Sequence, residues 1–193
     1  MLPLGFDFFD RPTLTVAREI LGCTLHWNDV SGIVVETEAY GAVGDEACHT
    51  SFRPSARRFF DSHSPGTAYV YMNYGIHWML NVLARDGIVL IRALEPRTGV
   101  DLMIKRRGVQ CLTSLCSGPG KLGQALGLSA EDHGTSLLNK GRCLTARSSG
   151  FDATRITTDT RIGITRAAEL PWRFLLDGHP HVSVPVKTGS GSG

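Results

Sequence analysis

The sequence predicts a single α+β domain, built on a curved and mainly antiparallel β-sheet with helices around it. Three observations lead to this fold class. The length of 193 residues favours one domain. Strand-like runs follow one another with short links between residues 23 and 93, which is typical of antiparallel pairing rather than of a doubly wound parallel sheet. One of those links is a tight turn, which predicts a protruding β-hairpin.

The first half of the chain supplies most of the predicted sheet. Residues 13–21 carry apolar side chains at helical spacing, and Gly22 closes this predicted helix. Residues 50–65 are polar and contain two prolines, so they predict a long loop. The strand-like runs are residues 23–27, 32–40, 67–74, 78–83 and 87–93.

The second half mixes helices with short strands. Residues 98–106 predict a short helix, and residues 120–128 predict another that opens at a Gly-Pro-Gly turn. The folded domain should span residues 1–187, while residues 188–193, rich in Gly and Ser, predict a flexible tail. Short strands are predicted at residues 155–158, 161–165 and 173–176.

Bulk composition narrows the class of protein. The net charge of +2 permits a nucleic-acid partner without arguing for one. No apolar run is long enough for a transmembrane helix and the N-terminus does not resemble a signal peptide, so no membrane partner is expected. The five cysteines, odd in number and without a Cys-x-x-Cys pair, predict neither a disulfide framework nor a zinc knuckle. The cysteine usage therefore fits a reducing, intracellular compartment.

Two glutamates on one predicted strand are the first candidates for catalytic residues. Side chains alternate along a strand, so Glu36, Glu38 and Tyr40 should project from the same face. A strand that only covers a core seldom needs two carboxylates on one face, and a carboxylate in an apolar sheet can serve as a general base. The alternative is a solvated strand face, because charged residues are mostly exposed.

A metal site is a second interpretation of the same region. Glu46 and His49 lie three residues apart, a spacing that metal-binding helices use, but a di-iron bundle needs two such pairs and only one is present. Glu36, Glu38, Glu46 and His49 could together supply ligands. A lone histidine of this kind more often forms a hydrogen bond, and we expect no metal or other cofactor.

Tyrosines mark the predicted hairpin. Tyr69 and Tyr71 share a strand face, and Tyr74 falls at the turn into the next strand. An exposed aromatic side chain at a hairpin tip suits insertion between base steps of DNA. The alternative is that all three tyrosines pack at the sheet edge.

Two polar residues enter otherwise apolar strands, Asn81 in residues 78–83 and Arg92 in residues 87–93. A buried Asn or Arg needs partners, so the two together indicate a polar cavity within the sheet. A plain ion pair of Arg92 with Glu36 or Glu38 is the alternative.

Several residues are candidates for contacts with a DNA backbone. The segment that begins at Gly118 matches G-x-G-x-x-G by letter, but no convincing strand precedes it and no acidic residue follows at the distance needed to hold a ribose. As a helix N-terminus, Gly120 and Lys121 could still bind a phosphate. Arg57 and Arg58, in the polar stretch after His49, are further candidates, although such clusters are as often solvated faces.

Five motifs, taken in order, resemble the alkyladenine (3-methyladenine) DNA glycosylase family, in which a β-hairpin enters the minor groove. The resemblance extends from about residue 8 to residue 183, and residues 51–64 depart from it. The motifs are Glu-Thr-Glu-Ala-Tyr, Asp-Glu-Ala-x-His, Pro-Gly-Thr-x-Tyr-Val-Tyr-x-x-Tyr-Gly, Arg-Ala-Leu-Glu-Pro and Ser-Gly-Pro-x-Lys-Leu.

The resemblance implies a role for each matching residue. Glu38 would activate the attacking water, and Arg92 and the main-chain carbonyl of Ile162 would help to hold that water. Tyr74 would fill the gap that a flipped base leaves in the duplex. The implied base pocket consists of Tyr40, His49, Tyr71 and Asn81, the last of which would crowd the 2-amino group of normal guanine.

The implied activity is that of a monofunctional DNA glycosylase of base-excision repair, acting as a monomer on double-stranded DNA that contains a damaged purine. Its substrates would be of the 3-methyladenine, 7-methylguanine, hypoxanthine and ethenoadenine type. Cleavage passes through a cation-like sugar, which a carboxylate can stabilise while it takes a proton from water. Apart from Lys121, the candidate for a phosphate contact, no lysine or N-terminal amine lies in the motifs to form a Schiff base, so an intact abasic site is the expected product. The resemblance also implies a cytoplasmic location, nucleoid-associated in a bacterium or nuclear in a eukaryote. A metal-dependent hydrolase and a non-enzymatic nucleic-acid-binding protein remain as alternatives.

Overall fold

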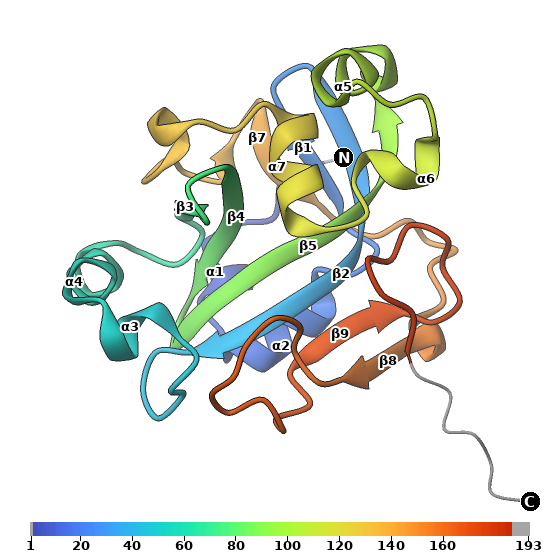
Figure 1. Ribbon diagram of the computed structural model, residues 1–193. Helices are drawn as coiled ribbons and strands as arrows, with labels where there is room; N and C mark the ends of the chain where they lie inside the picture. The colour runs from blue at the N-terminus through green and yellow to red at the C-terminus, as the bar shows by residue number, and fades with distance from the viewer. Residues whose placement is uncertain (1, 187–193) are drawn as a thin grey trace, which may run out of the picture.

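The computed structural model describes residues 2–186, and at their centre lies a strongly curled antiparallel sheet (Figure 1). The strands follow one another across the sheet in the order β3-β4-β5-β2-β1-β7-β6, while β9 pairs with both β2 and β8. This confirms the predicted α+β class; the tail predicted at residues 188–193 lies outside the described residues. The strands are β1 (Thr24–Trp27), β2 (Val30–Gly41), β3 (Ala68–Asn73), β4 (His77–Ala84), β5 (Gly87–Thr98), β6 (Leu138–Asn139), β7 (Arg142–Thr145), β8 (Ile156–Asp159) and β9 (Arg173–Leu176).

Helices cover both faces of the sheet. Helix α2 (Thr13–Glu19) lies behind it and buries Val16 and Ala17, whereas α7 (Pro119–Leu126) lies in front of β4 and β5 (Figure 1). No helix within residues 2–186 is long and apolar enough to cross a bilayer. The remaining helical segments are α1 (Phe6–Phe9), α3 (His49–Phe52), α4 (Pro54–Ser62), α5 (Val100–Arg107), α6 (Leu112–Leu115) and the 3-10 turns η1 (Ala130–Asp132) and η2 (Ala153–Arg155).

Strand β2 divides the molecule into a core side and a site side. The Thr37 hydroxyl donates a hydrogen bond to the carbonyl of Ala17 in α2 at 2.8 Å, so this face of β2 points to the buried helix. Glu36, Glu38 and Tyr40 therefore project from the opposite face, as the alternation predicted. One edge of β2 pairs with β5, and this pairing shifts register around Glu36. The other edge pairs first with β1 and then with β9. The two glutamates thus lie where the sheet branches.

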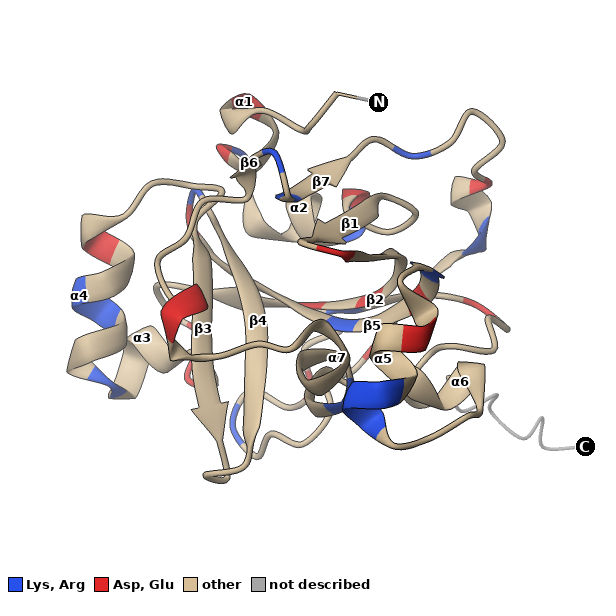
Figure 2. Cartoon of the chain, turned by 90° about the horizontal axis from the view of Figure 1, so that it is seen from above, with Lys and Arg blue, Asp and Glu red and all other residues tan. Residues whose placement is uncertain are grey.

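The predicted hairpin is confirmed. Strands β3 and β4 pair from Ala68 and Val82 to Asn73 and His77, and Figure 2 shows the hairpin extending beyond the body of the protein. Tyr74 lies at its tip, is 83% exposed and has a φ of 51°. A left-handed backbone at a tyrosine is uncommon and costs about 1–3 kcal/mol, which points to a local function for this turn.

The predicted loop at residues 50–65 is wrong, because most of it is helical. Residues 49–52 form α3, and Pro54 begins α4, where a proline is tolerated in the first turn since its missing N–H has no helical partner. Helix α4 turns Ala56, Phe59 and Phe60 towards the small apolar cluster that contains Tyr69. The prolines therefore mark helix boundaries here rather than a continuous loop.

Other elements also differ from the prediction. Residues 161–165 form no strand, because the Arg161 side chain is buried against Asp45 and the Ile162 N–H donates to Glu38. Strand β5 continues to Thr98, so α5 begins only at Val100, after Gly99 adopts a φ of 70°. The short strands β6 and β7 were not predicted at all.

Candidate functional site

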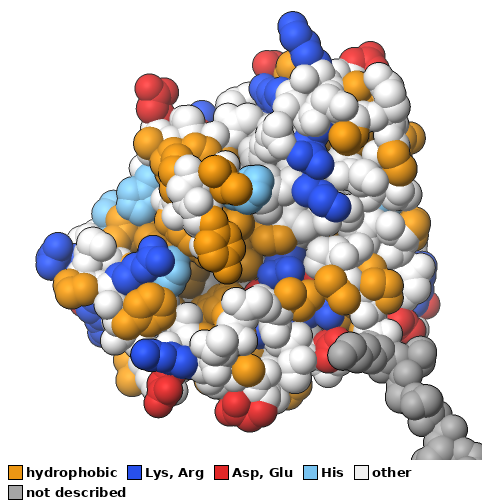
Figure 3. All heavy atoms as spheres, viewed as in Figure 1, with side chains coloured by type: hydrophobic (Ala, Val, Ile, Leu, Met, Phe, Trp, Pro, Cys, Tyr) orange, Lys and Arg blue, Asp and Glu red, His pale blue; other side chains and the backbone are white. Residues whose placement is uncertain are grey.

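A cavity of about 480 Å³ opens between the hairpin, β2, β5 and the start of α7. Its walls are largely aromatic and apolar, and Figure 3 shows the hollow as a patch of hydrophobic side chains with basic side chains on either side of it. The volume lies within the range of small-molecule sites. The structure brings most of the predicted site residues to this cavity: Tyr40, His49, Tyr71, Tyr74, Asn81, Arg92, Gly120, Lys121 and Ile162 all line it.

Glu38 lies directly behind this lining and has no exposed surface. Its Oε2 accepts a hydrogen bond from the Tyr40 hydroxyl at 2.7 Å and pairs with Arg92 Nη1 at 3.2 Å. Its Oε1 accepts a hydrogen bond from the backbone N–H of Ile162 at 2.7 Å. All three partners of the carboxylate therefore touch the cavity. The Ile162 carbonyl, which the resemblance assigns to the attacking water, belongs to the same residue.

Glu36 has different surroundings, although it projects from the same face. Its Oε1 accepts hydrogen bonds from Arg92 Nε at 2.9 Å and from Arg173 Nε at 2.8 Å. Ser183 donates from its hydroxyl to Oε1 at 2.7 Å and from its backbone N–H to Oε2 at 2.6 Å. Burial alone would raise the pKa of Glu36, but the charges of Arg92 and Arg173 and the bonds from Ser183 lower it. Glu36 is thus a saturated structural anion, and neither glutamate is on a solvated face.

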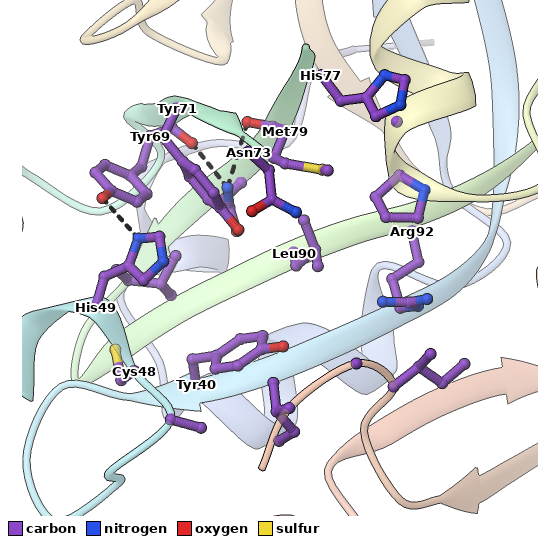
Figure 4. A pocket seen from close by; sticks show the side chains of 18 of the residues that line it. Tyr40, Cys48, His49, Tyr69, Tyr71, Asn73, His77, Met79, Leu90 and Arg92 are labelled. Carbon is purple, nitrogen blue, oxygen red and sulfur yellow. Dashed lines mark hydrogen bonds between the residues drawn. The ribbon is translucent and has the colours of Figure 1, made fainter. Parts of the chain in front are cut away.

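Histidine and tyrosine rings form one wall of the cavity. The rings of His49 and Tyr71 lie 4.4 Å apart at an interplanar angle of 63°, and the His49 Nδ1 shares a hydrogen bond of 3.0 Å with the Tyr69 hydroxyl (Figure 4). Burial, and then the charge of Arg53, lower the pKa of His49 to about 4, so the imidazole is neutral at pH 7. Burial raises the pKa of both Tyr69 and Tyr71 to about 12. The wall therefore carries no charge at neutral pH.

Tyr40 forms the opposite wall, from strand β2 (Figure 4). Burial and the neighbouring Glu38 carboxylate raise its pKa, which keeps the hydroxyl protonated as a donor. The Arg161 guanidinium lies 4.7 Å from the centre of the Tyr40 ring. Arg161 also forms a fully buried, two-point ion pair with Asp45, at 2.6 and 2.9 Å. This pair supports the loop that carries Ile162 to Glu38.

Asn81 occupies the predicted polar position and is 3% exposed. Its Nδ2 donates to the carbonyl of Tyr69 at 2.9 Å, across the paired strands β4 and β3. This bond fixes the amide in the wall of the cavity. The polar cavity and the ion pair of Arg92 with both glutamates, posed as alternatives, are both present.

The basic candidates separate into two groups. Lys121 lies at the start of α7 on the cavity rim, and a Cβ on Gly120 would come within 2.9 Å of the His77 ring. Arg57 and Arg58 lie on α4 and do not line the cavity. Arg57 pairs with Asp61 at 3.0 Å and donates to the carbonyl of Ala42, so its guanidinium already binds two groups of the protein.

Some residues at or near the cavity are not among the site residues that the sequence predicts. Tyr69 was placed on the same face as Tyr71, and that shared face was a signal for its contact with His49. Phe52 and Arg161 gave no comparable signal, because their places depend on helix α3 and on a partner 116 residues away. His77 follows the hairpin turn and lies at the cavity rim, where its ring is next to Gly120 of α7.

The residues of the metal alternative do not converge. Glu36 and Glu38 are occupied by arginine and main-chain donors, and Glu46 is exposed. Across the described part of the chain, no group of three or more His, Cys, Asp or Glu side chains is placed to hold a metal ion. The geometry therefore gives this alternative no ligand set.

Comparison with known proteins gives the family. Residues 7–180 match the methylpurine-DNA glycosylase family. The chain belongs to this family. A provisionally named 3-methyladenine DNA glycosylase of Rhizobium etli is 45% identical over 181 residues, which cover 93% of this chain and 88% of the relative. Proteins with the same provisional name from Rhodopseudomonas palustris (strain HaA2) and Chlorobaculum parvum are 46% and 42% identical, over 96% and 95% of this chain and 92% and 91% of the relatives. The chain is thus a DNA repair enzyme that hydrolyses N-glycosyl bonds.

Proposed function

We propose that this glycosylase flips a damaged purine out of double-stranded DNA into the cavity and cleaves its N-glycosidic bond with a water that Glu38 activates. The observation that carries this proposal is the buried Glu38 carboxylate, whose three partners Tyr40, Arg92 and Ile162 all line the cavity. A carboxylate in this position can take a proton from water and stabilise the cation-like sugar of the transition state.

Access to the carboxylate requires a small rearrangement. Glu38 has no exposed surface, so the Tyr40 hydroxyl must give way for a water to reach Oε2. Catalytic hydrogen bonds of this kind often form only when substrate is bound. Arg92 remains paired with the other glutamate through Nε and can hold the water through its Nη1. Among the described residues that line the cavity, Lys121 is the one amine, and it lies at the rim and is not a partner of Glu38, so the expected product is an intact abasic site.

Base selection follows from the two aromatic walls. Tyr40 and Tyr71 can stack on the two faces of a purine, and an electron-poor alkylated ring gains most from such stacking. Neutral His49 can form a hydrogen bond to the purine edge without repelling a cationic base. The proposed substrates are purines of the 3-methyladenine, 7-methylguanine, hypoxanthine and ethenoadenine type.

One assay tests the proposal. Duplexes that each contain one of these four lesions are incubated with the enzyme in the presence of EDTA, and both base release and strand integrity are measured. We expect base release without strand cleavage. Activity that disappears with EDTA and returns with a divalent metal would favour the metal-dependent alternative. Binding of lesion DNA with no base release would favour a non-enzymatic binding protein.

Replacing Asn81 by serine should admit undamaged guanine. The shorter side chain removes the amide that Tyr69 holds in the cavity wall, where the 2-amino group of guanine would otherwise clash. Removing this clash should make the release of normal guanine about tenfold faster, because a single small steric difference in a pocket usually changes selectivity by about this factor. The control variant is Asn139→Ser, at an exposed position in β6, and the release of guanine from undamaged duplex is measured for both variants. Equal guanine release by the two variants would refute this role of Asn81.

Replacing Tyr74 by alanine should impair release from duplex DNA but not from unpaired lesions. Tyr74 is 83% exposed at the hairpin tip, so its loss leaves the cavity intact while removing the wedge. Unstacking a base costs a few kcal/mol, so a loss of about tenfold or more is expected on duplex substrates. Ile76→Ala at the same tip, 72% exposed, serves as the control. A similar loss on single-stranded substrate would argue against the wedge.

A further inference from the structure

Ser183, in the segment that follows β9, touches both the structural anion Glu36 and the cavity residue Arg92. We infer that it is a positioning residue, which acts through these two groups to orient Arg92 towards Glu38. The inference rests on the function proposed above. The family match ends at residue 180, so Ser183 lies outside the matched region.

Ser183 makes two short hydrogen bonds to Glu36 and one longer contact with Arg92. Its backbone N–H donates to Glu36 Oε2 at 2.6 Å, and its hydroxyl donates to Glu36 Oε1 at 2.7 Å. The same hydroxyl oxygen accepts from Arg92 Nη2 at 3.4 Å. A single hydroxyl therefore donates to the anion and accepts from the cation, which uses both of its hydrogen-bonding capacities.

The geometry of the guanidinium transmits this effect to the catalytic carboxylate. Arg92 Nε is fixed by Glu36 at 2.9 Å and Nη2 by Ser183, which leaves Nη1 to meet Glu38 Oε2 at 3.2 Å. Because a guanidinium is planar and rigid, two fixed nitrogen atoms determine the direction of the third. The orientation of Nη1 towards Glu38 therefore depends on the other two contacts.

Competition between two arginines explains why the hydroxyl matters. Glu36 Oε1 accepts from Arg92 and from Arg173, and both guanidinium groups are almost fully buried. Arg173 is additionally held by Asp159 at 3.2 Å and by the carbonyl of Val184. Among the described residues, Ser183 is the one further anchor of Arg92 on the Glu36 side. Loss of the hydroxyl should therefore loosen Arg92 and leave Arg173 in place.

The test compares Ser183→Ala with the conservative Ser183→Thr, which keeps a hydroxyl, and with Ser62→Ala, which removes an exposed hydroxyl on α4. Single-turnover base release, DNA affinity and thermal unfolding are measured for each full-length variant. We expect Ser183→Ala to slow base release by about tenfold or more, the scale on which misplacement of a group beside the reacting atoms acts. DNA affinity should stay within about twofold, and Ser183→Thr should restore most of the rate.

Each other outcome has a defined meaning. An unchanged rate in Ser183→Ala, with an active wild type, overturns the positioning role alone. Equal losses in the alanine and threonine variants, together with weaker DNA binding and a lower unfolding temperature, would show that Ser183 only supports the fold and would also overturn it. A wild-type enzyme that releases no base from any lesion duplex would instead defeat the proposed function.

Discussion

Glu38→Gln should reduce base release by about a thousandfold while lesion DNA is still bound. The substitution preserves shape but removes the base, and general acid–base groups contribute about 10² to 10⁴ in rate. The loss includes a mismatch in hydrogen bonding. Oε1 and Oε2 both accept hydrogen bonds, from Ile162 on one side and from Tyr40 and Arg92 on the other, so the amide nitrogen of glutamine must face a donor. Single-turnover kinetics and a binding titration measure the two properties separately.

The matched control for this variant is Glu46→Gln. Glu46 is an exposed glutamate of the preceding loop and does not line the cavity. It should retain the wild-type rate, which excludes a general effect of lost negative charge on DNA binding. If Glu38→Gln keeps more than about a tenth of the wild-type rate, Glu38 is not the general base.

Asp45→Asn should lower the free energy of unfolding by about 3–5 kcal/mol, the range for breaking a buried ion pair by removing one partner. Both side chains of the pair are 0% exposed, so Arg161 would be left as an uncompensated buried cation. Asp45 also accepts from the backbone N–H groups of Gly41 and Ala47, which adds to the loss. For a chain of this size each kcal/mol shifts the unfolding temperature by about 2–4 °C, so the change should be readily measured.

A surface ion pair provides the comparison. Asp61 pairs with Arg57 at 3.0 Å, but both side chains are about half exposed, at 52% and 41%. Asp61→Asn should therefore cost less than about 1 kcal/mol. Equal losses for the two variants would show that the buried pair has no special weight. A second consequence of Asp45→Asn is slower base release, because Arg161 precedes the residue whose N–H binds Glu38.

The sequence predicted which face of β2 carries Glu36, Glu38 and Tyr40, because strand alternation is a local property. It could not distinguish the roles of Glu36 and Glu38, which look alike on a strand. Their roles depend on partners far along the chain: Arg173 lies 137 residues from Glu36, Ser183 lies 147 residues from it, and Ile162 lies 124 residues from Glu38. Only the folded sheet, with β9 paired beside β2, brings these groups together.

The errors have equally specific causes. Pro54 suggested a loop, but a proline at the start of a helix is compatible with the helix that follows. Residues 161–165 have strand-like composition, yet the Ile162 N–H binds the side chain of Glu38 and Gly163 has a φ of 76°. The apolar side chains that place α4 against Tyr69 act through tertiary packing, which periodicity over nine residues does not reveal.

Helix α7 packs closely against the first residues of β4, next to the hairpin turn. A Cβ on Gly123 would lie 2.0 Å from the carbonyl oxygen of Trp78, and a Cβ on Gly120 would lie 2.9 Å from the His77 ring. Such contact leaves the hairpin no room to pivot against the body. We therefore expect the hairpin to keep its shape on contact with DNA, so that the double helix deforms instead. Sites with loosened base pairs would deform at the lowest energetic cost.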